Sequence, residues 1–170
     1  MADRTPSEVT NLSQSGHAAL DWERVREALA GPVDSDYFLG TIGSDGRPHA
    51  AGVGALWFEG DMYFVSGPGT RKSRNVTKNP ACTLTAKISG MDLVIEGDAE
   101  RVTDQATLER LAAHYREVAS WPAEVEGDGF IAPYSAPSAG PPPWSLYRVT
   151  MHTVYCIAST EPHGATRWRF

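Results

Sequence analysis

Hydrophobic residues recur at the spacing of an amphipathic helix in two segments of the chain. The first covers residues 20–30, where Asp21 can cap the amino end and Gly31 can stop the helix. The second runs from a cap at Thr103 to about Ser120, and its apolar residues repeat at i, i+3, i+4 and i+7. This spacing puts apolar side chains on one face, so we expect each helix to pack that face against the rest of the protein.

Short apolar runs bounded by turn residues predict strands elsewhere in the chain. Most consecutive runs are separated by tight turns, which favours hairpins and therefore a mainly antiparallel sheet. One short helix interrupts the strands, opening at Thr70 and closed by Asn79-Pro80. This order predicts a mainly β protein, a small closed barrel with helices packed outside it. The predicted strands cover residues 37–42, 48–58, 62–66, 81–88, 91–102, 146–158 and 165–170.

Two segments lack any such periodicity. Residues 1–18 are polar, and we expect a flexible tail ahead of a single domain over residues 19–170. Residues 121–144 are rich in proline, glycine and serine, and they predict a long loop in which residues 141–143 adopt polyproline II. A loop of this length in a small domain is either functional or disordered, and both alternatives stay open.

Composition and charge narrow the classes of partner. The chain has 170 residues, of which 41% are hydrophobic, and a formal net charge of −6, which argues against non-specific binding to nucleic acid or an anionic membrane. No apolar run is long enough to cross a membrane and no secretory signal is visible, so we expect a cytoplasmic protein. Cys82 and Cys156 are too few for a disulfide framework, and we expect two buried, reduced thiols.

The strongest local signal is a group of cations at the start of the short helix. Arg71, Lys72 and Arg74 crowd its first turn, just after Thr70. Free N–H groups and the positive end of the helix dipole make cations unfavourable there unless an anion neutralises them. A phosphate would do so, with the N–H groups, the Thr70 hydroxyl and the guanidinium groups as donors. The alternative is a solvated surface turn.

Two further segments are open to a binding or a structural interpretation. Gly52 and Gly54 weaken a predicted strand, which would let a flat ligand lie against the backbone, or would allow a bulge or close helix packing. In the last predicted strand, Trp168 and Arg169 belong to an alternation of aromatic and cationic residues. That strand could pack across a partner subunit, or it could be an edge strand kept soluble by arginine.

No side chain stands out as an acid, a base or a nucleophile. The five histidines show no metal-site spacing, and no nucleophile elbow or phosphate loop is present. If the protein is an enzyme, we therefore expect a cofactor to carry the chemistry, and we expect no metal site.

Taken together, several stretches give the chain a resemblance to a known superfamily. They are residues 62–66, Gly69-Thr70-Arg71-Lys72, Asn79-Pro80 and the block 91–102 that leads into the long helix. In these stretches the chain resembles the flavin-binding split-barrel superfamily, which includes pyridoxamine 5'-phosphate oxidase and reductases that use FMN or the deazaflavin coenzyme F420. The resemblance covers about residues 36–118 and implies a small antiparallel split β-barrel with flanking α-helices.

The resemblance also implies which residues bind the cofactor. In this superfamily a Ser/Thr-Arg-Lys motif grips the cofactor phosphate, and Thr70, Arg71 and Lys72 match it. Arg74 and Asn75 match a Lys-x-Arg-Asn variant that is seen in relatives using the deazaflavin.

Other cofactor contacts are implied by position in the superfamily's strands. Trp168 and Arg169 are similar to an ending that reaches the cofactor of the partner subunit. The residues implied to line the isoalloxazine ring are Val53, Gly54, Val65 and Ser66.

For function, the resemblance implies a homodimeric oxidoreductase with FMN or F420 at the subunit interface. Hydride would pass to or from a small planar substrate, and the loop over residues 121–144 would be a lid. FMN and F420 stay equally open. In the oxidase proper, a cation stands at each end of an apolar stretch on the second strand, and an Arg-x-His substrate motif lies near the carboxyl end. This chain has neither feature, since the corresponding stretch is residues 51–56 and contains no cation. We therefore do not expect oxidation of pyridoxamine phosphate. The alternatives are a non-catalytic flavin or heme binding or sensor protein, and a dimeric interaction module without cofactor.

Overall fold

The computed structural model describes residues 4–31 and 36–170, and antiparallel strands make up most of its regular structure. The helices in this part of the chain are α1 (Trp22–Ala30), α2 (Arg71–Lys78) and α3 (Gln105–Val118). The strands are β1 (Glu8–Asn11), β2 (Tyr37–Ile42), β3 (Pro48–Val53), β4 (Ala55–Phe58), β5 (Asp61–Ser66), β6 (Ala81–Ile88), β7 (Met91–Val102), β8 (Glu124–Glu126), β9 (Gly129–Ile131), β10 (Ser145–Ala158) and β11 (Gly164–Arg169).

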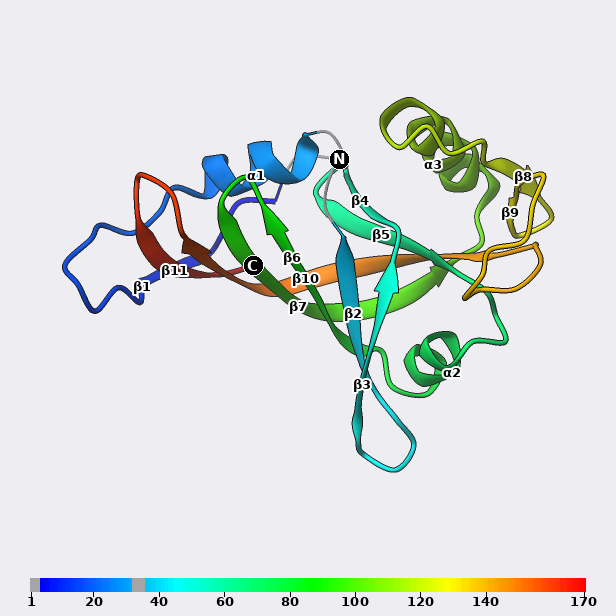
Figure 1. Ribbon diagram of the computed structural model, residues 1–170, viewed down its shortest axis with the longest axis horizontal. Coiled ribbons are helices and arrows are strands. Elements are labelled where there is room, and N and C mark those ends of the chain that lie inside the picture. Colours follow the sequence, from blue (N-terminus) through cyan, green and yellow to red (C-terminus); the bar gives the residue numbers. More distant parts are fainter. Residues whose placement is uncertain (1–3, 32–35) are drawn as a thin grey trace.

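The long strand β10 organises the barrel, because its two halves have different neighbours. Strand β7 pairs with β10 along its whole length, and Figure 1 shows the two crossing the middle of the molecule. On the other edge β10 pairs first with β5 and then with β11. The pairing of β10 with β7 has a register shift between Met151 and Thr153. The circuit continues through β6, β2, β3 and β4 back to β5. The split β-barrel with flanking helices is confirmed.

The barrel closes at Gly54, where the sequence pattern predicts one continuous strand over residues 48–58. The structure divides that strand, because β3 pairs with β2 while β4 pairs with β5. The Tyr115 hydroxyl donates to the Gly54 carbonyl at 3.3 Å and so attaches α3 to this corner. Glycine weakens a strand locally, and here the weak point lies where the chain turns from one edge of the barrel to the other.

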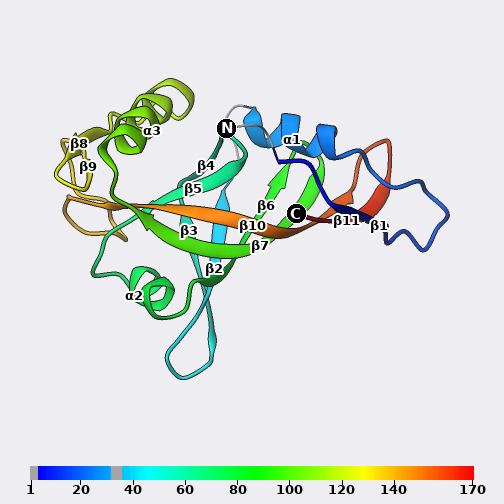
Figure 2. The same cartoon turned by 180° about the vertical axis from the view of Figure 1, so that it is seen from behind.

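Apolar side chains pack on both faces of β5 and β10, as the alternation along a strand requires. Phe64 and Tyr147 stack inside the barrel with ring centroids 4.9 Å apart. Their neighbours Tyr63 and Leu146 point the other way, into a second cluster with Leu108 of α3. Full burial of one such side chain contributes about 1.5–3 kcal/mol. Figures 1 and 2 accordingly show α2 and α3 on opposite sides of β10.

The helix caps are mostly those predicted. The Asp21 carboxylate accepts from the Glu23 N–H at the start of α1, and Thr70 caps α2. Helix α3 begins one residue later than predicted, since Asp104 is its cap and accepts from the Thr107 N–H at 2.9 Å. Thr103 and Asp104 are both good capping residues, and the sequence alone does not choose between them.

The amino-terminal segment contains a strand where we expected a flexible tail over residues 1–18. Strand β1 pairs with β11 and covers its outer edge, so β11 is not an edge strand. The Glu8 carboxylate bonds to Arg167 at 2.9 Å and to Arg169 at 3.1 Å. Backbone pairing and polar contacts hold β1, and neither leaves an apolar pattern in the sequence.

The segment over residues 121–144 is also more regular than the long loop predicted. It contains the hairpin of β8 and β9, and Phe130 pairs with Trp144 in an isolated bridge. Figure 2 shows the hairpin beside α3. Three-residue strands among proline and glycine are too short to show a period, so the sequence pattern misses them.

Both cysteines are buried free thiols, as predicted. Burial raises the pKa of Cys82 to about 12 and that of Cys156 to about 11, so both stay protonated at neutral pH. Neither thiol is therefore a nucleophile. Within the described residues, no helix has the length and apolar character needed to span a membrane.

Candidate functional site

The predicted phosphate motif lies where β5 ends and α2 begins, and a triangle of hydroxyl groups braces it. Ser66 Oγ lies 2.9 Å from Thr70 Oγ1 and 2.9 Å from Ser73 Oγ, and Thr70 Oγ1 lies 3.1 Å from Ser73 Oγ. Thr70 Oγ1 also accepts from the Ser73 N–H at 3.3 Å. Ser66 and Ser73 are buried, so the triangle joins the first turn of α2 to the barrel.

Ser73 was not predicted as a site residue, although its position three residues after the cap is a recognised capping position. Ser66 was predicted to line the isoalloxazine ring. Its side chain is fully buried in the triangle. Both residues position Thr70.

The cations of the motif have no carboxylate partner in residues 4–31 and 36–170. Arg74 donates to the Gly69 carbonyl. Arg71 is exposed and lies against the β2–β3 turn, with Nη2 3.4 Å from the place where a Cβ on Gly43 would be. Lys72 is only 6% exposed and forms neither a hydrogen bond nor an ion pair with any described residue.

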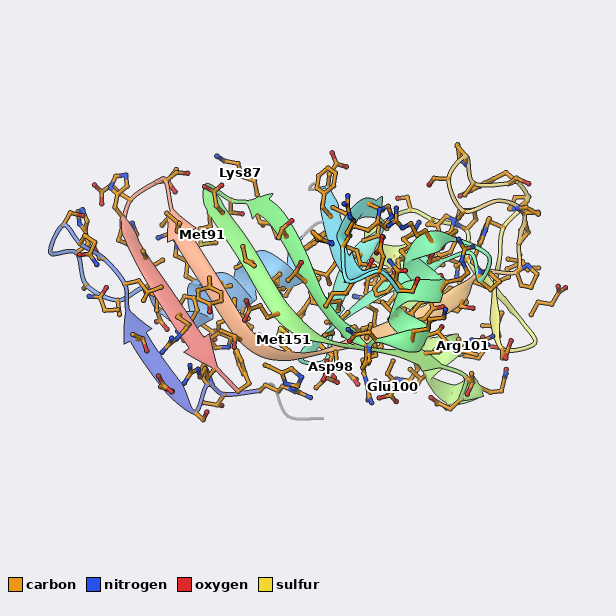
Figure 3. All side chains as sticks on the ribbon, turned by 90° about the horizontal axis from the view of Figure 1, so that it is seen from below. Lys87, Met91, Asp98, Glu100, Arg101 and Met151 are labelled. Atoms are coloured by element: carbon orange, nitrogen blue, oxygen red, sulfur yellow. The ribbon has the colours of Figure 1, made fainter. Side chains whose placement is uncertain are left out.

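Arginines on other elements mostly face carboxylates. Figure 3 shows Asp98, Glu100 and Arg101 following one another along β7, and Glu100 and Arg101 both belong to such pairs. The uncompensated positive charge therefore gathers at the start of α2, in a chain that is negative overall. The ion pairs are Arg4–Asp61, Arg26–Glu23, Arg101–Asp128, Arg110–Glu59, Arg148–Glu100, Arg167–Glu8 and Arg169–Glu8.

The burial of Lys72 has an electrostatic consequence. Burial lowers the pKa of its ammonium group below the usual range, because a low-dielectric environment disfavours the charged form. Lysine is almost never fully buried unless it is paired. Together with the helix dipole and the free N–H groups of the first turn, this side chain makes the start of α2 suited to an anion.

Asn75, predicted as a cofactor residue, holds α2 in place. Its Nδ2 donates to Thr41 Oγ1 at 2.9 Å, and both residues are buried. Thr41 in turn donates to the His49 carbonyl at 3.4 Å. Asn75 therefore ties α2 to the β2–β3 hairpin.

Two of the predicted ring-lining residues, Gly54 and Val65, border an apolar pocket of about 300 Å³ on the α3 side of β5. Val53 points elsewhere and packs against the barrel core. A Cβ on Gly67 would collide with the Ala139 carbonyl, so only glycine lets the 121–144 segment pack this close to the phosphate motif. The pocket lining consists of Gly54, Val65, Tyr115, Ala119, Trp121, Tyr134, Ala136, Ala139 and Trp144.

At the carboxyl end, the two residues expected to reach a partner's cofactor lie in different surroundings. Trp168 is 1% exposed and packs against Trp22, with ring centroids 5.5 Å apart. Arg169 is exposed but pairs with Glu8. The alternation of aromatic and cationic residues is as predicted, but the aromatic face points into the barrel and β1 covers the strand edge. The described residues also contain no group of three His, Cys, Asp or Glu side chains that could hold a metal ion.

Comparisons with known proteins agree with this fold. The family model for pyridoxamine 5'-phosphate oxidase matches residues 23–164. An F420 reductase shares 21% identity, with a TM-score of 0.51, over 76% of this chain and 94% of its own. A FAD-binding protein from Mesorhizobium loti shares 18% identity, with a TM-score of 0.56, over 89% of this chain and 96% of its own.

A heme binding protein from Mycobacterium smegmatis shares 17% identity, with a TM-score of 0.59, over 84% of this chain and 56% of its own. At these identities the structures show a shared fold. Among curated proteins the chain has no significant match. The family match spans most of the barrel and includes the cation motif at the start of α2, and it shows that the chain belongs to the pyridoxamine 5'-phosphate oxidase family.

Proposed function

We propose that this protein is an oxidoreductase that uses FMN or coenzyme F420. The observation that carries the proposal is the uncompensated positive charge at the start of α2, and above all the buried Lys72. Arg71 and Lys72 would hold the cofactor phosphate together with the Thr70 hydroxyl and the N–H groups of the first turn. The ring would lie toward Gly54 and Val65, at the apolar pocket.

The residues present fit such a cofactor at both ends. Cations and hydroxyl groups suit its phosphate, and an uncharged wall suits its flat ring. When bound, the cofactor supplies hydride transfer. The protein's own residues bind and orient it, and the 121–144 segment keeps water from the ring. No side chain in the pocket is placed as an acid or a base, since burial raises the pKa of Tyr115 and keeps its hydroxyl neutral.

Pyridoxamine 5'-phosphate, after which the family is named, fits this site less well than the cofactors do. The run over residues 51–56 lacks the flanking cations that an anionic pyridoxamine phosphate would need. Structural neighbours are named for F420, FAD and heme, so the fold accommodates several cofactors. We therefore propose hydride exchange with a small planar substrate.

A flavin store without turnover is the second candidate, because the pocket offers no catalytic side chain. Heme is less well supported, because the pocket lining contains no His, Cys or Met, and Tyr115 already donates its hydroxyl to backbone carbonyls, which leaves Tyr134 as the one side chain to ligate its iron. The test is to load the protein with FMN or F420, reduce it without oxygen, and mix it with planar acceptors. Reoxidation much faster than for free cofactor supports the oxidoreductase, and reoxidation no faster supports the store.

We also infer a homodimer with the cofactor at its interface. Phe38 and Ile42 are exposed on the outer face of β2, beside a groove of about 430 Å³ between β2, β6 and β7. Helix α2 packs against the same strand through Asn75 and Thr41. A second copy covering this face would bury the apolar side chains and bring its own residues close to the phosphate motif.

A further inference from the structure

A second pocket, which we call the polar pocket, lies at the amino end of α3, away from the site described above. It is lined by β5, β10, the ends of β4 and β7 and the first turns of α3. We propose that it binds a small apolar α-amino acid as the zwitterion, with the ammonium group on Asp61 and the carboxylate on Arg148. Its volume of about 230 Å³ is below the range of about 300–1,000 Å³ for drug-sized ligands, which limits the ligand to a small molecule.

Asp61 is a buried hydrogen-bond acceptor without a donor. The residue is 5% exposed, it lines the polar pocket, and no described residue donates a hydrogen bond to its carboxylate. Its ionic partner Arg4 lies 3.4 Å away, whereas a charge-assisted hydrogen bond measures about 2.7–2.9 Å. Burial raises the pKa of the Asp61 carboxyl, because Arg4 and Arg148 do not offset the lost hydration. An ammonium group in the pocket would supply the donors that this carboxylate lacks.

Tyr63 adds a second buried polar group without a partner. It lies two residues after Asp61 in β5, so the two side chains share a face of the strand. Tyr63 is 7% exposed and lines the polar pocket, and its hydroxyl forms no hydrogen bond with any described residue. Buried side-chain polar groups are normally hydrogen-bonded. The polar end of a bound ligand would satisfy this hydroxyl together with Asp61.

Arg148 supplies the positive charge beside these two residues. It is paired in register with Tyr63 on β5 and with Glu100 on β7 (Figure 3), so the three residues form one row across the sheet. Arg148 Nη2 lies 3.3 Å from each carboxylate oxygen of Glu100, which is longer than in a tight pair. Arg148 Nη1 donates to no described residue. The guanidinium group therefore keeps donors for a ligand carboxylate.

The charges of the lining favour a ligand that carries both signs. A ligand with one charge would meet like charges on the walls, whereas a zwitterion can place each charge beside its opposite. Phe58 and Val102 form the apolar part of the lining, and they suit an apolar side chain of moderate size. The charged residues of the lining are Glu59, Asp61, Glu100, Arg101, Asp104, Arg110 and Arg148.

The test is a calorimetric titration with L-leucine and two analogues that each lack one of its charges. 3-Methylbutylamine is leucine without the carboxylate, and 4-methylpentanoate is leucine without the ammonium group. We expect saturable binding of leucine, and binding of each analogue weaker by at least about tenfold, because a hydrogen bond to a charged group is lost in both.

Two variants assign the two charges to their residues. Asp61→Asn should weaken leucine binding at least about tenfold and remove the preference for leucine over 4-methylpentanoate. Arg148→Met should remove the preference for leucine over 3-methylbutylamine. If Asp61→Asn does not fold, Tyr63→Phe takes its place, and loss of the hydroxyl alone should weaken leucine binding about twofold to tenfold.

Asp92→Asn is the matched control, because Asp92 also faces a cation at 3.4 Å but lies outside the polar pocket. No saturable binding of leucine, an analogue that binds as tightly as leucine, or equal losses in Asp61→Asn and Asp92→Asn would each overturn the assignment. The proposed function does not depend on this result, since Asp61 belongs neither to the phosphate motif nor to the apolar pocket.

Discussion

The position of Lys72 could be predicted from the sequence, but its burial could not. The sequence pattern places it in the first turn of a helix, where a cation is unfavourable. The structure adds that it is buried and unpaired among the described residues. Burial depends on how α2 packs against the barrel, which no local pattern encodes.

The lowered pKa of Lys72 predicts a pH dependence. Above pH 7, affinity for FMN or F420 should fall as pH rises through this lowered pKa, because the amine loses the charge that attracts the phosphate. In Lys72→Arg, which stays protonated, affinity should change less over the same window. In the unliganded protein, stability should rise with pH in that window, because the unfolded chain binds the extra proton. Equal pH profiles for the two proteins would contradict this account.

Gly67 makes a second residue-scale prediction. Gly67→Ala should destabilise the protein by about 1–3 kcal/mol, the range for overpacking, because its Cβ would collide with the Ala139 carbonyl. Gly69→Ala is the control, since a Cβ there meets nothing within 4 Å. Urea denaturation of both variants measures the difference. Equal stabilities would mean that the 121–144 segment does not pack tightly on Gly67.

At the scale of elements, the strands and helices whose apolar residues repeat at a regular spacing were predictable, and the others were not. The stripe of α3 and the alternation of β10 follow from apolar spacing. Strands β1, β8 and β9 depend on backbone pairing with distant segments, so they leave no such pattern. The break at Gly54 has the same origin, because it follows from which strands β3 and β4 meet.

The candidate site also has one part that the sequence predicts and another that it does not. The phosphate motif at Thr70, Arg71 and Lys72 was predictable because helix start, charge and turn lie together in the sequence. Alternation alone does not say which face of the last strand points inward, so the burial of Trp168 in the core could not be predicted. The aromatic pocket joins α3, β5 and the 121–144 segment, and only the fold brings them together.

The hydroxyl triangle that holds α2 can be tested as a unit. Ser73→Ala should cost about 1–3 kcal/mol of stability, since it removes two of the three hydrogen bonds of the triangle and leaves only the one between Ser66 Oγ and Thr70 Oγ1. In a double-mutant cycle, Ser66→Ala should then cost less than it does in the wild type. Ser44→Ala, in the exposed β2–β3 turn, is the control. Strictly additive effects of the two serine substitutions would show that the triangle is not cooperative.

At the scale of the whole molecule, the barrel presents the phosphate motif beside an exposed apolar face on β2. If a second copy covers that face, Phe38→Glu should convert a dimer to a monomer in sedimentation experiments and weaken cofactor binding. Val9→Glu is the control, because Val9 is similarly exposed but lies on β1, which pairs only with β11 among the described strands. A wild-type monomer, or a dimer unaffected by Phe38→Glu, would refute the proposed interface.

The most direct test of the central claim is a calorimetric titration of the wild type and two lysine variants with FMN and, separately, with F420. Lys72→Met keeps the buried volume and removes the charge, while Lys78→Met removes the same charge from the exposed last turn of α2. We predict saturable binding of one cofactor, a loss of at least about tenfold in Lys72→Met, and little change in Lys78→Met. If neither cofactor binds, or if the two variants lose affinity equally, the start of α2 is not the phosphate site.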